Sequence, residues 1–215
     1  MTTFNFALAR REATDLVDVT GGVAVLNRSY PISHAHNRVL VTATSAVDVS
    51  VAEAERVLGG AELSHRRIDW VDGDPPAGAD RLMSAGWTFE RSVHMCLTRS
   101  EEQTSVDSNA LTVPFDRLRD TVLQVWLGEL RILDLDGRRV AQIEDVINLP
   151  AQRGHGHASA VVRHAVAAAR ARGCDVVWLE ADADDCPQHL YRKLGFDDVG
   201  RASSATLVPQ LHDHR

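Results

Sequence analysis

The feature that most limits how this chain can fold is a turn containing two glycines, between a β-rich stretch and a helix. In the segment "EDVINLPAQRGHGHASAVVRHAVAAARARG", the β-rich part stops at Pro150 and an alanine-rich helix is predicted from Ser159 to Ala171. Gly154 and Gly156 let the backbone of the turn approach a ligand without a Cβ in the way. The first turn of a helix carries N–H groups without intrahelical partners. The pattern therefore predicts an anion site, to which Arg153 adds a positive charge.

Metal binding is the alternative interpretation of this turn, because His155 and His157 also lie in it. His34 and His36 repeat the same spacing. A zinc site needs three or four converging ligands, and Cys, Asp and Glu are absent at ligand spacing from these histidines. We therefore expect no metal, and a metal-dependent protein that uses the paired histidines is the weakest of the hypotheses.

Composition excludes several classes of protein. The formal net charge of −7 disfavours a nucleic-acid binder, which usually has a basic surplus, and is compatible with a cationic substrate. No apolar run reaches the length of a membrane span, and the N-terminus lacks the pattern of a signal peptide. Cys96, Cys174 and Cys186 are scattered and form no CxxC pair. We expect a cytoplasmic protein without membrane or nucleic-acid partners.

The chain is predicted to be an α/β protein with two related halves. Each half has the order strand, helix, strand, short helix, glycine-aromatic, strand, and "LMSAGWTFERSVHMCL" in the first half parallels "LYRKLGFDDVGRASSATL" in the second. The polar segment before Leu111 is the best linker candidate. We expect an N-terminal domain of residues 1–100, a linker of 101–112 and a C-terminal domain of 113–215.

Several elements can be placed more closely. Ser50 is expected to cap a helix of Val51 to Leu58, and a further helix is expected to begin at Pro114. Asp136-Gly137 predicts the two-residue turn of a hairpin. "DVVWLEAD" predicts a buried strand, and Pro187 to Leu194 a helix.

The segment "RGHGHA", Arg153 to Ala158, fits the pattern Arg/Gln-x-x-Gly-x-Gly/Ala. It resembles the coenzyme A loop of the GNAT superfamily of acetyl-CoA-dependent N-acyltransferases. "EDVINLP" precedes it as the family's fourth strand does, and "LYRKLGF" follows as the family's tyrosine helix and closing strand do. The resemblance covers residues 128–201. It implies a mixed, splayed central sheet flanked by helices, in a tandem whose N-terminal half is degenerate and lacks the loop.

The resemblance also implies a site for acetyl-CoA. In this family the fourth-strand backbone pairs with the pantetheine arm, a role that falls to Ile147, Asn148 and Leu149. A splay between that strand and the fifth, Val176 to Glu180, would admit the thioester. The loop amides hold the pyrophosphate, and the residues at those positions are Arg153, Gly154, His155, Gly156, His157, Ala158 and Ser159.

For catalysis, the resemblance assigns the general acid that protonates the leaving thiolate to Tyr191; packing without a proton role is the alternative. Glu144 and Asp145 lie on the fourth strand with side chains on opposite faces. We favour Glu144 as the base. The alternatives are a carboxylate that only orients the acceptor or pairs with an arginine, and a water chain that takes the proton. Asp184 stands where the family often has Asn, which puts any side-chain contact to the cofactor there in doubt.

The resulting hypothesis is an N-acetyltransferase that moves the acetyl group of acetyl-CoA to a primary amine of a small molecule or peptide, by direct attack in a ternary complex. The alternative is a non-catalytic acyl-CoA-binding module that acts as a sensor or scaffold. The sequence identifies no particular acceptor and leaves a homodimer open.

Overall fold

The computed structural model describes residues 2–99, 127–147 and 150–208 of the chain. The described residues form two compact units. The first lies within Met1–Val93, Asp182–Asp184 and Gly200–Arg215, and the second within His94–Ala181 and Asp185–Val199.

The first unit is built around a sheet with short helices. Its elements are α1 (Thr2–Glu12), β1 (Asp15–Val19), β2 (Gly22–Leu26), β3 (Arg38–Val41), α2 (Val47–Ala54), a π-helical turn (Glu55–Gly59), β4 (Arg66–Trp70), α3 (Asp80–Ser84) and the first part of β5 (Thr88–Leu97). β1, β2 and β3 pair antiparallel in sequence order, and β3 pairs parallel with β4. The core includes Leu58, Ile68 and Trp70, each of them fully buried.

Two features of the first unit differ from expectation. α2 begins at Val47, with Ala46 at its N-cap, so the prediction that Ser50 caps the helix is wrong. Ser50 is buried inside the helix, where its hydroxyl donates to the Ala46 carbonyl at 3.0 Å instead of capping an N–H group. The sequence analysis also missed α1 and β1.

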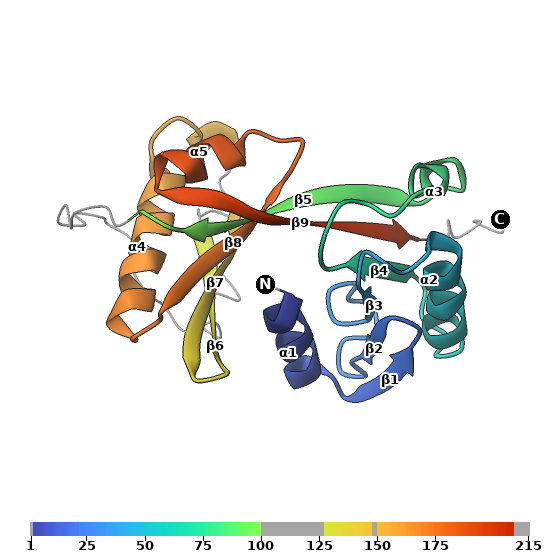
Figure 1. Cartoon of the computed structure of the whole chain (residues 1–215). Coiled ribbons are helices and arrows are strands. Elements are labelled where there is room, and N and C mark those ends of the chain that lie inside the picture. The colour runs from blue at the N-terminus through green and yellow to red at the C-terminus, as the bar shows by residue number, and fades with distance from the viewer. Residues whose placement is uncertain (1, 100–126, 148–149, 209–215) are drawn as a thin grey trace. The chain divides into compact units, whose positions relative to one another are not determined.

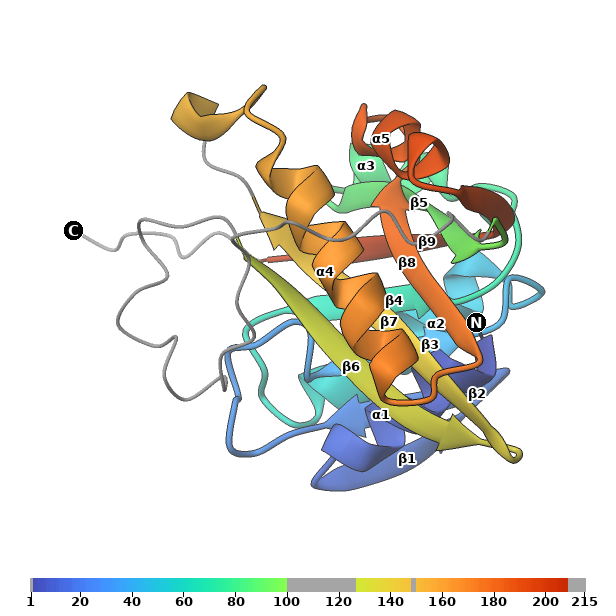
Figure 2. The same ribbon diagram turned by 90° about the vertical axis from the view of Figure 1, so that its left-hand side faces the viewer.

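The second unit contains the glycine turn. Its elements are the second part of β5, β6 (Leu127–Leu135), β7 (Arg138–Ile147), a 3₁₀ turn (Pro150–Gln152), α4 (His157–Ala171), β8 (Val176–Asp182), α5 (Pro187–Lys193) and the first part of β9 (Phe196–Leu207). The predicted hairpin is confirmed: Asp136 and Gly137 both have positive φ, at 49° and 77°, and join β6 to an antiparallel β7. α4 packs on β6 and β7 (Figure 2).

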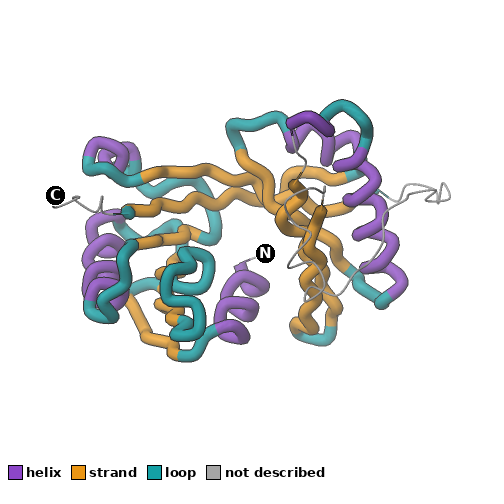
Figure 3. Tube along the Cα trace, turned by 180° about the vertical axis from the view of Figure 1, so that it is seen from behind, coloured by secondary structure: helices purple, strands orange, loops and turns teal. Residues whose placement is uncertain are grey.

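The strands are hydrogen-bonded in the order β1-β2-β3-β4-β9-β5-β8-β7-β6, which is a mixed sheet flanked by helices, as predicted. The long strands β5 and β9 are neighbours in this order (Figure 1). The run β3-α2-β4-α3-β5 in the first half matches β7-α4-β8-α5-β9 in the second, so the predicted repeat of element order is confirmed. Figure 3 shows the helices and strands of the described residues from behind, coloured by type.

The expected domain boundaries stay a prediction. The linker of 101–112 and the helix expected from Pro114 lie outside the described residues. Among the described residues, the end of β9 belongs to the first unit and the end of β5 to the second, so each unit takes in one strand from the other half of the sequence.

Candidate active site

The glycine turn leads directly into α4, as the sequence predicts. Gly156 is the N-cap residue, with φ of 80° and no side-chain hydrogen bond to the helix, and no acidic residue lies in the first helical turn. Gly154 has φ of 82°, and a Cβ added to either glycine would meet no atom within 4 Å. The turn therefore presents bare backbone and the positive end of a helix dipole to open space, which suits an anion.

The histidines of this turn lie against each other. The rings of His155 and His157 stack with centroids 6.0 Å apart, and His155 Nδ1 lies 3.0 Å from the Arg153 carbonyl. Because a carbonyl only accepts, Nδ1 carries the proton in this contact. Ala158 and Ser159 continue into the first turn of α4. No group of three or more metal-ligating side chains occurs within the described part of the chain.

Beside the turn, β7 separates from its neighbour. The registered pairs of β7 with β8 run from Val140–Val176 to Ile143–Leu179, and both strands continue beyond. On its other side, β7 has one more residue than β6 between its pairs at Glu144 and Ile147, and Asp145 at this bulge has φ of 50°. Ile147 is 48% exposed. The predicted contacts Asn148 and Leu149 lie outside the described residues.

Glu144 lies where the two strands separate and has an unusual environment for a carboxyl group. Burial raises the pKa of Glu144 to about 7, and the negative charge of Glu180 contributes next. Asp145 and Glu129 act in the same direction, whereas Arg131 opposes them. Arg131 is itself bound to Glu129 at 3.0 Å. A carboxyl group with a pKa near neutrality can take up and release a proton at physiological pH.

Tyr191 comes from α5 and is brought near Glu144. Its side chain is buried, and its ring meets that of Phe196 edge to face, with centroids 6.3 Å apart. Burial raises the pKa of Tyr191, and the charge of Glu144 raises it further. The phenol therefore stays protonated at neutral pH, as a general acid must. The predicted acid and base thus lie close enough for the charge of one to affect the other.

Three further polar residues of this region, Gln142, His94 and Glu180, were missed by the sequence analysis. Gln142 is buried, and its Nε2 donates a hydrogen bond to Glu144. His94 of β5 is also buried, with Nε2 lying 3.4 Å from a carboxylate oxygen of Glu180 and its ring edge-on to Trp178. The signal available was a polar residue at alternate positions in apolar strands, but which strands are neighbours cannot be read from one sequence.

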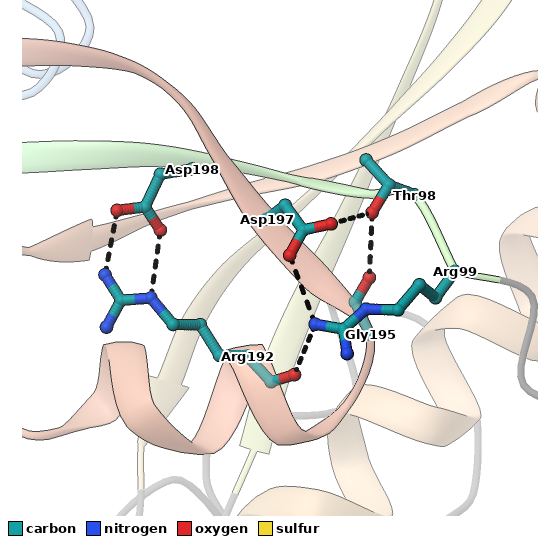
Figure 4. A network of polar contacts seen from close by, with 6 residues as sticks. All are labelled: Thr98, Arg99, Arg192, Gly195, Asp197 and Asp198. Atoms are coloured by element: carbon teal, nitrogen blue, oxygen red, sulfur yellow. Dashed lines mark hydrogen bonds and ion pairs between the residues drawn. The ribbon is translucent and has the colours of Figure 1, made fainter.

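A network of polar contacts anchors α5, and with it Tyr191 (Figure 4). Arg99 contacts the Asp197 carboxylate and the Arg192 carbonyl, each at 3.1 Å, and Arg192 pairs with Asp198 at 2.8 Å. The carbonyl of Gly195 accepts hydrogen bonds from the backbone N–H groups of Thr98 and Arg99. The end of β5 is thereby joined to α5 and to the start of β9.

Asp184 has a partner within the first unit. Its carboxylate pairs with Arg91 at 2.7 Å, and its backbone N–H donates to Asp182. Asp184, which stands where the family often has Asn, therefore forms an ion pair with Arg91.

None of the described helices is long and apolar enough to span a bilayer.

Comparisons with known proteins identify the family. A segment of 63 residues is 40% identical to streptothricin acetyltransferase of Streptomyces lavendulae; it covers 29% of this chain and spans only 33% of that protein. The fold resembles a GCN5-related N-acetyltransferase from Kribbella flavida, with a TM-score of 0.63, 15% identity and coverage of 98% of this chain and 96% of the other. It also resembles a conserved protein of unknown function from Staphylococcus epidermidis, with a TM-score of 0.62, 10% identity and coverage of 90% and 94%. Residues 89–196, half of the chain, match the sequence profile of the acetyltransferase (GNAT) family, and the chain belongs to that family.

Proposed function

We propose that the protein is an N-acetyltransferase that transfers the acetyl group of acetyl-CoA to a primary amine in a ternary complex. The observation that carries the proposal is the proximity of a near-neutral carboxyl group, Glu144, to a buried phenol, Tyr191, where β7 and β8 separate. A base and an acid are the two proton-transfer groups that acetyl transfer to an amine needs.

The glycine turn fits the diphosphate of coenzyme A. Gly154 and Gly156 leave the backbone open, and the helix start has no acidic side chain to repel an anion. The residues that would hold the diphosphate run from Arg153 to Ser159. The edge of β7 after Ile143, which has no registered pair with β8 among the described residues, would receive the pantetheine arm. Ile147 is the described residue of that edge nearest the turn.

Acetyl-CoA supplies the acetyl group as a thioester, so that a bond forms from the acceptor nitrogen to the acetyl carbon and the bond to sulfur breaks. Glu144 takes the proton that makes the amine nucleophilic. Tyr191 donates the proton that the departing sulfur requires, and regains one from the acylated nitrogen. The proton on Glu144 leaves to solvent, so one proton is released for each ammonium ion acetylated.

The acceptor is proposed to be a small molecule or a peptide with a primary amine. The partial match to a streptothricin acetyltransferase makes streptothricin the first small molecule to test. A cytoplasmic location and the lack of nucleic-acid or membrane partners stay predictions from the sequence. The sequence leaves a homodimer open.

The second candidate is a module that binds acyl-CoA without turnover. Binding alone requires no proton transfer, so it does not account for a carboxyl group whose pKa lies near 7. Incubation with acetyl-CoA and a panel of primary amines, including streptothricin and a lysine peptide, separates the two. Release of free thiol together with an acetylated amine identified by mass spectrometry supports the enzyme, and the Glu144→Gln variant should lose most of that activity. Tight binding of acetyl-CoA without any acetylated product would favour the module.

A further inference from the structure

A second carboxylate, Glu180, has no role in the reaction described so far. Ile143 and Leu179 form the last registered pair of the parallel strands β7 and β8, so Glu144 and Glu180 are the next residue on each strand. Side chains alternate along a strand, so both project to the sheet face that carries Gln142. Two carboxylates thus stand side by side at the point where the strands separate.

Gln142 adds a third oxygen to this pair, and it is an independent sign of a ligand. Its side chain is 2% exposed, and its Nε2 donates to Glu144. The other atom of the same amide, Oε1, is buried and accepts no hydrogen bond from the described residues. A buried acceptor without a donor is costly, and one that lies beside a catalytic carboxylate is suited to a donor that arrives with the substrate.

His94 lies next to Glu180, although its Nε2 makes no hydrogen bond among the described residues. The histidine is buried between strands, edge-on to Trp178, with Nε2 3.4 Å from the Glu180 carboxylate. The Glu180 side chain is 34% exposed, so a ligand can reach its carboxylate.

The charges around Glu144 favour a cation. The negative charges of Glu180, Asp145 and Glu129 all raise the pKa of Glu144, and the positive charge of Arg131 opposes them only in part. The phenol of Tyr191 is uncharged while it holds its proton. A positive group placed between the two glutamates would relieve their mutual repulsion.

We propose that Glu144, Glu180 and the Gln142 Oε1 atom form a subsite for a primary ammonium group. An R–NH₃⁺ group has three N–H donors, one for each of the three oxygens. The acceptor of the proposed reaction would therefore bind as the ammonium ion and pass one proton to Glu144 before it attacks. This use of the subsite rests on the proposed acetyl transfer, but the binding of an ammonium ion does not.

The subsite can be tested without turnover. The titration of Glu144 is followed by NMR on protein labelled at the glutamate carboxyl carbons, with the signal assigned by its loss in Glu144→Gln. Ethylammonium chloride is the probe, and tetramethylammonium chloride at equal ionic strength is the control because it has no N–H donor. Ethylammonium should bind the carboxylate form and lower the apparent pKa of Glu144 by about half a pH unit or more relative to tetramethylammonium.

Two variants and a control locate the effect. Glu180→Gln and Gln142→Met should each reduce the difference between the two salts severalfold. Asp145→Asn also removes a negative charge near Glu144, and Asn tolerates the left-handed backbone of that position, so it should leave the difference intact. Equal titration curves in both salts, or an undiminished difference in Glu180→Gln, would overturn the subsite.

A kinetic measurement separates the subsite from the proposed function. If acetyl transfer is observed, Glu180→Gln should raise the KM for the amine by about tenfold or more, because hydrogen bonds to charged groups contribute about 1.5–3 kcal/mol. The affinity for acetyl-CoA should not change. An unchanged amine KM would reject the subsite while leaving acetyl transfer in place, whereas a failure to bind acetyl-CoA would reject the proposed function and leave the titration result standing.

Discussion

At the scale of single residues, Glu144 determines how the proposed reaction depends on pH. A base acts only when deprotonated, and the pKa of Glu144 is raised to about 7. We expect kcat/KM for the amine to rise with pH through about 7 and then level off, until another group titrates. Glu180→Gln removes a neighbouring negative charge, so it should move this rise to lower pH. A pH–rate profile that is flat between weakly acidic and weakly basic pH would exclude Glu144 as the base.

The same carboxyl group should cost stability at high pH. Its pKa is about 7 in the folded protein against 4.5 as a model group, so its contribution is fully present below about 4.5 and is lost as pH rises through 7. Glu144→Gln cannot ionise, so it avoids this loss of stability at high pH. Because the site is partly open to solvent, we expect a gain of about 1–3 kcal/mol in the free energy of unfolding at pH above 7. Urea unfolding below pH 4.5 and above pH 7 measures the difference, and the variant should gain nothing at the acidic end.

Tyr191 should contribute to the chemical step more than to binding. Tyr191→Phe keeps the buried ring and its contact with Phe196 and removes only the hydroxyl. General acid catalysis is typically worth about 10²–10⁴-fold, so kcat should fall by a factor in that range while acetyl-CoA affinity changes little. Steady-state kinetics and calorimetry report the two quantities. An unchanged kcat would mean that the tyrosine packs against the core and that water protonates the thiolate.

At the scale of elements, Gly195 allows β5, α5 and β9 to meet. Its φ is 91°, and an added Cβ would lie 3.1 Å from the Arg99 carbonyl. Gly173 also has positive φ, 73°, but a Cβ there would meet nothing within 4 Å. Gly195→Ala should therefore lower the free energy of unfolding by about 1–3 kcal/mol, and by more than Gly173→Ala. Equal losses in the two variants, measured by urea unfolding, would mean that the close approach is unimportant.

Local patterns predicted the elements that carry their own signals. Asp136-Gly137 defines its hairpin because few residues adopt two successive positive φ angles, and the glycine turn and α5 have equally local signatures. Ser50 misled the analysis because a serine can cap a helix or bond back to the preceding turn, and packing decides between them. Gln142, Glu180 and His94 were missed because only strand order and register bring them to one place.

At the scale of the whole molecule, the two halves share an element order but differ at the turn before the long helix. In the first half, α2 has Asp48 in its first turn, and the Ala43 N–H in the preceding loop already donates to Asp72. A carboxylate at a helix start disfavours a second anion. In the second half, the corresponding turn has two open glycines and no acidic residue in the first helical turn. Only the second half should therefore bind a diphosphate.

The proposed diphosphate site at the glycine turn can be tested by introducing a bulky, negatively charged side chain. Gly156→Glu would place a side chain and a negative charge in the space proposed for the diphosphate, so acetyl-CoA binding should be lost. Gly137→Glu is the matched control, because its φ of 77° imposes similar backbone strain in a hairpin turn with open space around it. That variant should bind acetyl-CoA as the parent chain does.

Isothermal titration of the full chain with acetyl-CoA tests the central claim most directly. The account predicts one molecule bound per chain, with binding abolished in Gly156→Glu and preserved in Gly137→Glu. Two molecules per chain would mean that the first half has a site of its own, and unchanged affinity in Gly156→Glu would contradict the assignment of the glycine turn as the acetyl-CoA site.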